Sequence, residues 1–281
     1  MFLVAFLAFL LSLTYGQEAG FSDPVVLAGT LIAVATFALF IAAERRVAQP
    51  MVDLTLFRSS DLSVNLLTGF LQFVSIAGLL ILLPFYLSDT LGYSTREVGF
   101  LLASVPITLG ILAPLSGSLS DRLGTRPVTV AGLAVTLVGY VAARLVYAVD
   151  TTALEFVVVG LIIGAGIGLF QSPNNSAILG AVPRERLGIT SGMLTINRIS
   201  GQIVGIAVLG TVWATRTVAY AGGGTAESAP PAAQAEGLSD TLLVPIALMI
   251  VALAVALLAW RSEREPRDAA PAGTDPIPDQ S

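Results

Sequence analysis

One segment between two long apolar runs concentrates charged and glycine residues at spacings that could do chemistry. It reads Gly117-Ser-Leu-Ser-Asp121-Arg122-Leu-Gly124-Thr-Arg126-Pro127. Gly117 would let two backbones approach closely, and Gly124 can adopt a conformation that a side chain disfavours. Asp121 could accept hydrogen bonds from the amides that open the next helix, whereas Arg122 and Arg126 could bond carbonyl oxygens or an acidic partner. This spacing predicts a short connection that holds two helix ends in fixed register.

Arg198 is the sharpest single feature, because it falls near the middle of the apolar run 187–214. A guanidinium at the centre of a bilayer costs about 2.5–3.5 kcal/mol by insertion scales, so it persists only beside a cavity or a partner. Two interpretations stay open. Arg198 could line a cavity, where it binds anionic groups or biases a proton site. Alternatively, it could lock helices together by bonding amides such as Gln72 or Asn197.

Other uncharged polar residues interrupt the apolar runs. The run Gln171-Ser-Pro173-Asn174-Asn175-Ser176 could be a helix interruption that marks a binding site, or a helix end capped by its own amides. Gln72 could line a cavity, or could be a buried amide that a neighbouring helix satisfies. Arg198, Gln72, Asn197, Asn174 and Asn175 are therefore the cavity candidates.

Small residues recur at intervals of four on two apolar runs, at Gly160, Gly164 and Gly168, and at Gly201 and Gly205. This spacing places them on one helix face and predicts close helix packing.

The residue types exclude several chemistries. All fourteen basic residues are Arg, and the chain contains no Lys, His or Cys. Zinc sites, thiol chemistry and histidine relays built from this chain are excluded. No catalytic triad, metal cluster or phosphate loop is evident, so we expect no enzyme activity, no cofactor and no metal. The net charge of −5 gives no reason to expect a nucleic-acid partner.

The composition indicates the medium in which the chain folds. Of its 281 residues, 55% are hydrophobic and 12% are charged, against about 25% charged in an average soluble domain. A deficit this deep predicts that a lipid bilayer surrounds most of the chain. Eight runs approach the roughly 20 residues needed to cross it: 1–15, 24–43, 62–87, 97–118, 127–149, 154–180, 187–214 and 240–260. We therefore expect an all-α integral membrane protein with about eight transmembrane helices.

The first run is short and begins at Met1 without a positively charged leader. We interpret it as a helix whose beginning has been cut off; a cleaved signal peptide is the alternative.

Arginine placement predicts the orientation. Ten arginines fall on one side if the helices alternate, and three (Arg96, Arg144 and Arg216) fall on the other. Because basic residues are retained in the cytoplasm, the first set and the C-terminus are expected there, in a multi-pass protein of the plasma membrane.

The chain is expected to divide into a two-helix hairpin (1–45), a charged cytoplasmic linker (46–61), a six-helix bundle (62–260) and a disordered cytoplasmic tail (261–281). A long outer loop rich in Ala, Gly and Pro is expected at 216–240.

The pattern G-x-L-x-D-R-x-G-x-R at Gly117–Arg126 resembles the signature loop of the major facilitator superfamily of secondary transporters. A generic basic hairpin is the alternative for this segment. Two helices ahead of a six-helix bundle are similar to the fourteen-helix drug:proton antiporter branch. Three further phrases also look like that branch: Pro50–Arg58, Pro84–Ser94 and Gly188–Gly201. The resemblance covers residues 1 to about 260 and departs from the family in one respect, the missing N-terminal six-helix half.

The resemblance implies proton-coupled efflux of amphipathic drugs or metabolites, with protons as the coupling ion. Gly117, Asp121, Arg122, Gly124 and Arg126 would then form the signature loop that gates or stabilises the cytoplasmic face. No Asp or Glu lies deep in a predicted span, so the coupling carboxylate would belong to the missing half. The alternative function is that of a non-transporting membrane scaffold or a truncated remnant.

Overall fold

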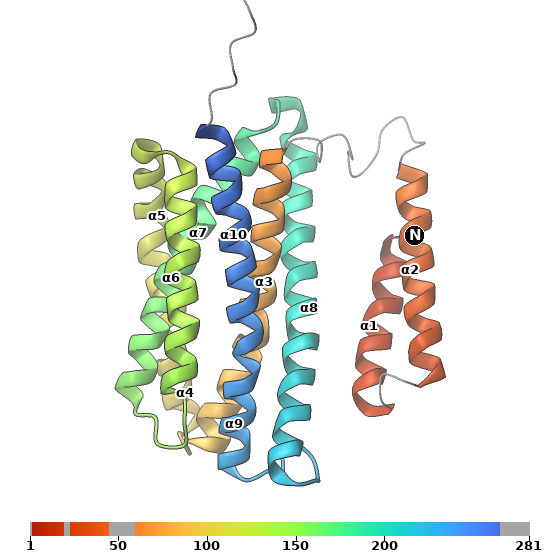
Figure 1. Cartoon of the computed structure of the whole chain (residues 1–281), viewed down its shortest axis with the longest axis vertical. Coiled ribbons are helices and arrows are strands. Elements are labelled where there is room, and N and C mark those ends of the chain that lie inside the picture. The colour runs from red at the N-terminus through yellow and green to blue at the C-terminus, as the bar shows by residue number, and fades with distance from the viewer. Residues whose placement is uncertain (1, 20–22, 45–59, 265–281) are drawn as a thin grey trace, which may run out of the picture.

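The computed structural model describes residues 2–19, 23–44 and 60–264, and every regular element within these ranges is a helix (Figure 1). The expected all-α class is therefore confirmed. The predicted linker and tail fall mostly outside the described residues. Of the linker, the structure describes Ser60 and Asp61, which open the third helix.

Two helices precede the bundle, α1 (Phe2–Ala19) and α2 (Pro24–Glu44), and they pack against each other. Asp23 accepts a hydrogen bond from the amide of Val25 (2.8 Å), which satisfies one of the free amides at the start of α2. The outward faces are apolar; Leu11 is 68% exposed and Leu31 69% exposed. Such faces suit lipid rather than water.

Six further spans follow, each long and apolar enough to cross a membrane. They are α3 (Ser60–Phe85) with the π-turn η2 (Tyr86–Thr90), α4 (Thr95–Leu102) with α5 (Ser104–Leu123), α6 (Thr125–Val146), α7 (Ala153–Gly180), η3 (Arg184–Arg186) with α8 (Leu187–Ala221), and α9 (Pro231–Thr241) with α10 (Leu243–Arg264). With α1 and α2 they account for the eight runs read from the sequence.

Capping boxes set the starts of two of these helices. Ser94 and Glu97 cap α4 reciprocally, and Thr152 and Glu155 do the same for α7. In each case the hydroxyl accepts from the amide three residues on, and the Glu carboxylate accepts from the amide of the capping residue.

The contacts between the helices follow a repeated pattern. Four of them form a ring in which α3 contacts α7 and α10, and α6 also contacts α7 and α10. The two remaining long helices lie outside the ring: α8 packs on α3 as α5 packs on α7. The units α3–α5–α6 and α7–α8–α10 are thus equivalent, which is the pattern of a repeated three-helix element.

Glycines permit the closest of these contacts. A Cβ added to Gly205 of α8 would collide with the backbone carbonyl of Val74 on α3. A Cβ on Gly164 of α7 would lie 2.7 Å from the carbonyl oxygen of Val105 on α5, and one on Gly132 of α6 would lie 2.5 Å from the amide nitrogen of Phe170 on α7. Small residues let helix backbones meet in this way without hydrophobic driving force, which lipid does not supply.

The expected outer loop at 216–240 differs from the structure. Helix α8 continues to Ala221, and α9 begins at Pro231, so only residues 222–230 connect them. Composition alone suggested disorder, but α9 buries Leu238 and places Gly237 directly against Thr217 of α8. Tertiary packing therefore orders a segment whose intrinsic preferences are weak.

We predict that Gly205→Leu lowers the thermal stability of the purified protein, because the new side chain must displace the α3 backbone; overpacking of this kind costs about 1–3 kcal/mol. Gly210→Leu on the same helix is the matched control, since a Cβ there meets nothing within 4 Å. The melting temperature in detergent measures both. Equal melting temperatures for the two variants would contradict the α3–α8 contact.

Candidate functional site

The signature segment is almost entirely helical. Gly117 to Leu123 form the last turns of α5, and α6 begins at Thr125, so Gly124 alone connects the two helices. Gly124 has a φ of 89°, a conformation that favours glycine because it lacks a Cβ. The sequence predicted a connection with several residues in the turn; the turn is instead one residue long.

Asp121 does not act as the expected cap. Among the described residues, no hydrogen bond joins the Asp121 carboxylate to the first turn of α6, and Asp121 is exposed at the end of α5. Arg122 is also exposed. Both side chains point to the surface of the bundle because α5 continues as a helix through them.

Arg126 has the acidic partner that its type suggested. Its Nη2 donates to Oδ1 of Asp61 at 2.5 Å, which joins the first turn of α6 to the first turn of α3. The side chain of Arg126 is 16% exposed and that of Asp61 is 54% exposed. This ion pair fixes the register of the two helix ends. The sequence identified Asp61 only as a helix-end residue, because no local pattern links positions so far apart.

A serine on α5 donates a hydrogen bond to the backbone of α7, five residues before Pro173. Ser116 donates to the carbonyl of Gly168 at 2.8 Å, and Ser172 approaches Gly117. Helix α7 runs without interruption through Pro173. Neighbouring hydroxyls commonly satisfy backbone groups near a proline in a membrane helix.

The cavity candidates separate into two places. Gln72 is 2% exposed, and its Nε2 lies 3.5 Å from Oγ1 of Thr136 on α6. Asn174 is 3% exposed and packs on Gly69 of α3. Asn197 donates to the carbonyl of Leu66 at 3.0 Å, also on α3. These amides therefore lie between helices inside the bundle, while Asn175 on the next position of α7 is half-buried.

Arg198 lies elsewhere, on an exposed face of α8, a helix whose described neighbours include α1, α3 and α9. Its side chain is exposed, and within the described ranges no hydrogen bond or ion pair holds it. The locking contact to Gln72 or Asn197, one of the two interpretations of this arginine, is absent there. Ser191, Thr195 and Gln202 share this helix face by spacing, at intervals of three or four residues. A polar stripe with a guanidinium suits water or a polar partner rather than acyl chains.

The glycines of α7 and α8 lie at helix contacts rather than on the exposed face of α8. Gly160 packs against Ser104 and Gly168 against Leu112, both on α5, whereas a Cβ on Gly201 would lie 2.9 Å from Cβ of Phe73 on α3. The same spacing thus gives α8 one face that contacts α3 and another face that is open.

The opposite end of the bundle holds a polar cluster that the sequence did not reveal. Asp240 of α9 lies 3.6 Å from Arg216 and accepts from the hydroxyl of Tyr220 at 3.0 Å. Arg144 of α6 donates to the hydroxyl of Ser239 at 2.9 Å and to its carbonyl. These contacts tie the ends of α6, α8 and α9 together. Arg144 near a helix boundary was the only signal for them.

Six helices of membrane-spanning length and apolar composition, packed against one another, define an integral membrane protein of the multi-helix class. The model of the Major Facilitator Superfamily matches residues 66–279, and the chain belongs to this family. It is a multi-pass membrane protein, and its family transports small molecules rather than catalysing reactions.

Several relatives are similar over most of this chain. The multidrug resistance protein Stp of Mycobacterium tuberculosis is 32% identical over 215 residues, which is 76% of this chain and 40% of Stp. The quinolone resistance protein NorB of Staphylococcus aureus is 28% identical over 217 residues (75% of this chain, 47% of NorB). The riboflavin transporter RibZ of Clostridioides difficile is 29% identical over 184 residues (66% and 40%). The chain thus spans less than half the length of these relatives.

Proposed function

We propose that the chain acts as the C-terminal part of an efflux carrier of the fourteen-helix branch. In this proposal α1 and α2 are the two linker helices, and α3 to α10 form one of two bundles. The substrates would be amphipathic organic compounds; the relatives Stp and NorB are a multidrug resistance protein and a quinolone resistance protein. The observation that carries the proposal is the polar face of α8, where Arg198, Ser191 and Thr195 are exposed.

A polar helix face within the membrane requires a partner or water, because lipid can satisfy neither charge nor hydrogen bonds. A second bundle, packed against α5 and α8, would turn this face into one wall of a central cavity. Rocking of one bundle against the other would then alternate access to the cavity. Arg198 would contact anionic groups of the substrate or bias a nearby proton site.

Coupling to protons belongs to the same proposal. Every Asp and Glu in the six described spans lies near a helix end rather than at the centre. A buried carboxylate that alternates between the two sides of the membrane would therefore have to come from the other bundle. The ion pair of Arg126 with Asp61, and the exposed Asp121 and Arg122, would stabilise the cytoplasmic face.

A second candidate function is that of a membrane scaffold without transport activity. The two candidates differ in what Arg198 does, because a scaffold has no use for an uncovered cation in the bilayer.

In the full-length carrier, Arg198→Ala should lower export of a drug substrate about tenfold, since losing one charge-assisted contact costs about 1.5–3 kcal/mol. Arg198→Lys should retain part of the activity. Arg184→Ala, which removes an exposed arginine before the same helix, serves as the control. Drug efflux from loaded cells, at matched amounts of protein in the membrane, measures all three. Undiminished export by Arg198→Ala would count against the carrier role of this residue.

The proposed orientation places the α5–α6 connection and the C-terminus in the cytoplasm of a cell whose plasma membrane holds the protein. Because the chain contains no cysteine, single cysteines report cleanly on topology. A membrane-impermeant maleimide added to intact cells should label Glu227→Cys, in the α8–α9 connection, and should label Arg122→Cys only after lysis. Labelling of Arg122→Cys in intact cells would reverse the orientation.

A further inference from the structure

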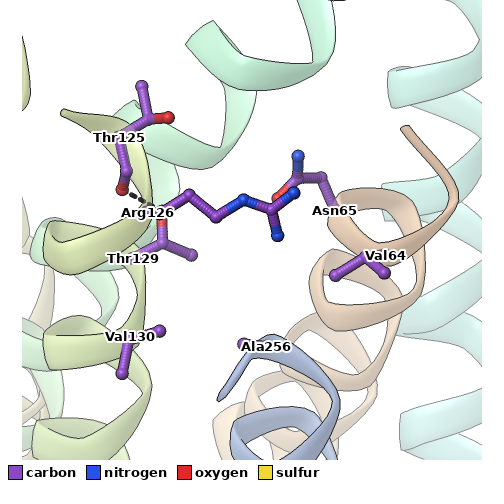
Figure 2. Close-up of a pocket in the computed structure, with 7 residues that line it drawn as sticks. All are labelled: Val64, Asn65, Thr125, Arg126, Thr129, Val130 and Ala256. Carbon is purple, nitrogen blue, oxygen red and sulfur yellow. Dashed lines mark hydrogen bonds between the residues drawn. The ribbon is translucent and has the colours of Figure 1, made fainter. Parts of the chain in front are cut away.

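A shallow pocket lies at the end of the bundle that carries the signature segment, where the ends of α3, α6 and α10 meet (Figure 2). It is a small hollow that opens to solvent. Its lining residues are Val64, Asn65, Thr125, Arg126, Thr129, Val130 and Ala256. Three elements far apart in sequence thus contribute to one site.

Arg126 supplies the charge of this pocket. Figure 2 shows its side chain crossing from α6 towards Asn65 on α3. One nitrogen of the guanidinium donates to Asp61 at the rim. A guanidinium carries five N–H donors in a planar fork, so it can donate to several acceptors at once.

Asn65 is the second and independent observation. Asn65 is 7% exposed, and it lines the pocket from the α3 side. Among the residues that the structure describes, none forms a hydrogen bond with its carboxamide. The N–H groups of this carboxamide are therefore available to a ligand oxygen in the pocket.

The start of α6 adds a third contribution. No side chain of the N-cap residue Gly124 satisfies its first amides, and Pro127 removes one donor that the helix would otherwise leave free. Thr125 and Arg126 lie at the positive end of the α6 helix dipole, which favours negative charge nearby. Guanidinium, carboxamide and helix start are all donors, and together they select an anion with several oxygen atoms, such as a phosphate group.

The remaining wall of the pocket is apolar. Val64, Val130 and Ala256 come from three different helices, all of which span the membrane. A free phosphate ion gains nothing from such a wall, whereas the glycerol and upper acyl carbons of a phospholipid would cover it. Donor-rich pockets between membrane helices at the level of the headgroups have the chemistry that binds lipid phosphates.

We propose that this pocket binds the phosphate of a phospholipid headgroup, with Arg126 and Asn65 donating to its oxygens and Val64, Val130 and Ala256 contacting the glycerol end of the acyl chains. The lipid would bridge α3, α6 and α10, and so would hold the end of the bundle together beside the Asp61–Arg126 ion pair. This site faces a different set of helices from the open face of α8, so it stands apart from the proposed substrate route.

Native mass spectrometry of the purified 281-residue chain, titrated with phosphatidylglycerol in detergent, tests this site. The unmodified chain should retain one lipid with saturable binding. Asn65→Leu, which removes the amide at nearly constant volume, and Arg126→Gln should each raise the dissociation constant about tenfold, the factor expected from 1.4 kcal/mol. Arg122→Gln, which removes an exposed arginine on the neighbouring helix, should change it less than about twofold, as surface charges contribute little.

Two further arms separate the alternatives. Asp61→Asn breaks the ion pair but keeps the two donors, Arg126 and Asn65, so this variant should bind the lipid at least as well as the unmodified chain. Because it also removes the contact between α3 and α6, it shows whether Arg126→Gln weakens binding only by separating these helices. Inorganic phosphate in large excess should fail to displace the lipid. Wild-type affinity in both Asn65→Leu and Arg126→Gln, with melting temperatures that show folded protein, would overturn the site. Displacement by inorganic phosphate would make the free ion the ligand and overturn the lipid assignment.

Discussion

Close approach of helix backbones at glycine is the interaction on which the bundle depends. Lipid acyl chains solvate apolar side chains as favourably as a neighbouring helix does. Burial of leucine therefore cannot by itself hold membrane helices together. What remains is dense packing of backbone on backbone. Gly205 against Val74 joins α8 to α3, Gly164 against Val105 joins α7 to α5, and Gly132 against Phe170 joins α6 to α7. Without these contacts the polar groups of the bundle would have no fixed positions.

The same packing determines which helix faces are left open. The ring of α3, α6, α7 and α10 buries its interior, where Tyr140 and Met249 are fully covered. Helix α8 presents its own glycines to α3, whereas α5 packs against the glycines of α7. In both outer helices, the side turned away from the ring is left more exposed. On α5 that side is apolar, with Ile107 58% and Ile111 61% exposed, whereas on α8 it carries Arg198. In the proposed carrier, this difference in chemistry between the two faces links the fold to transport.

Much of this architecture could be predicted from the sequence. Apolar length located the membrane helices, and the spacing of Gly160, Gly164 and Gly168 indicated a packed face, because both signals are local along the chain. The signature pattern led to the family, although its segment proved to be helix on both sides of Gly124. The ordered helix α9 was missed, since its order comes from contact with Thr217 rather than from its composition.

Contacts between distant positions were beyond such reasoning. Asp61 and Arg126 are separated by a whole pair of helices, and nothing local connects them. Gln72 and Asn174 had two interpretations each, because helical periodicity does not say which neighbour covers a given face. The burial of both residues follows from the ring arrangement.

The central claim is that the uncovered face of α8 borders a water-filled route, while its opposite face is sealed against α3. Single cysteines along α8 of the full-length carrier, reacted in membranes with a small water-soluble maleimide, measure this directly. Cysteines at Thr195, Arg198 and Gln202 should react readily, whereas cysteines at Met193 and Ala207, which are buried, should stay unmodified. Equal reactivity on both faces, or no reaction at Thr195, Arg198 and Gln202, would contradict the account.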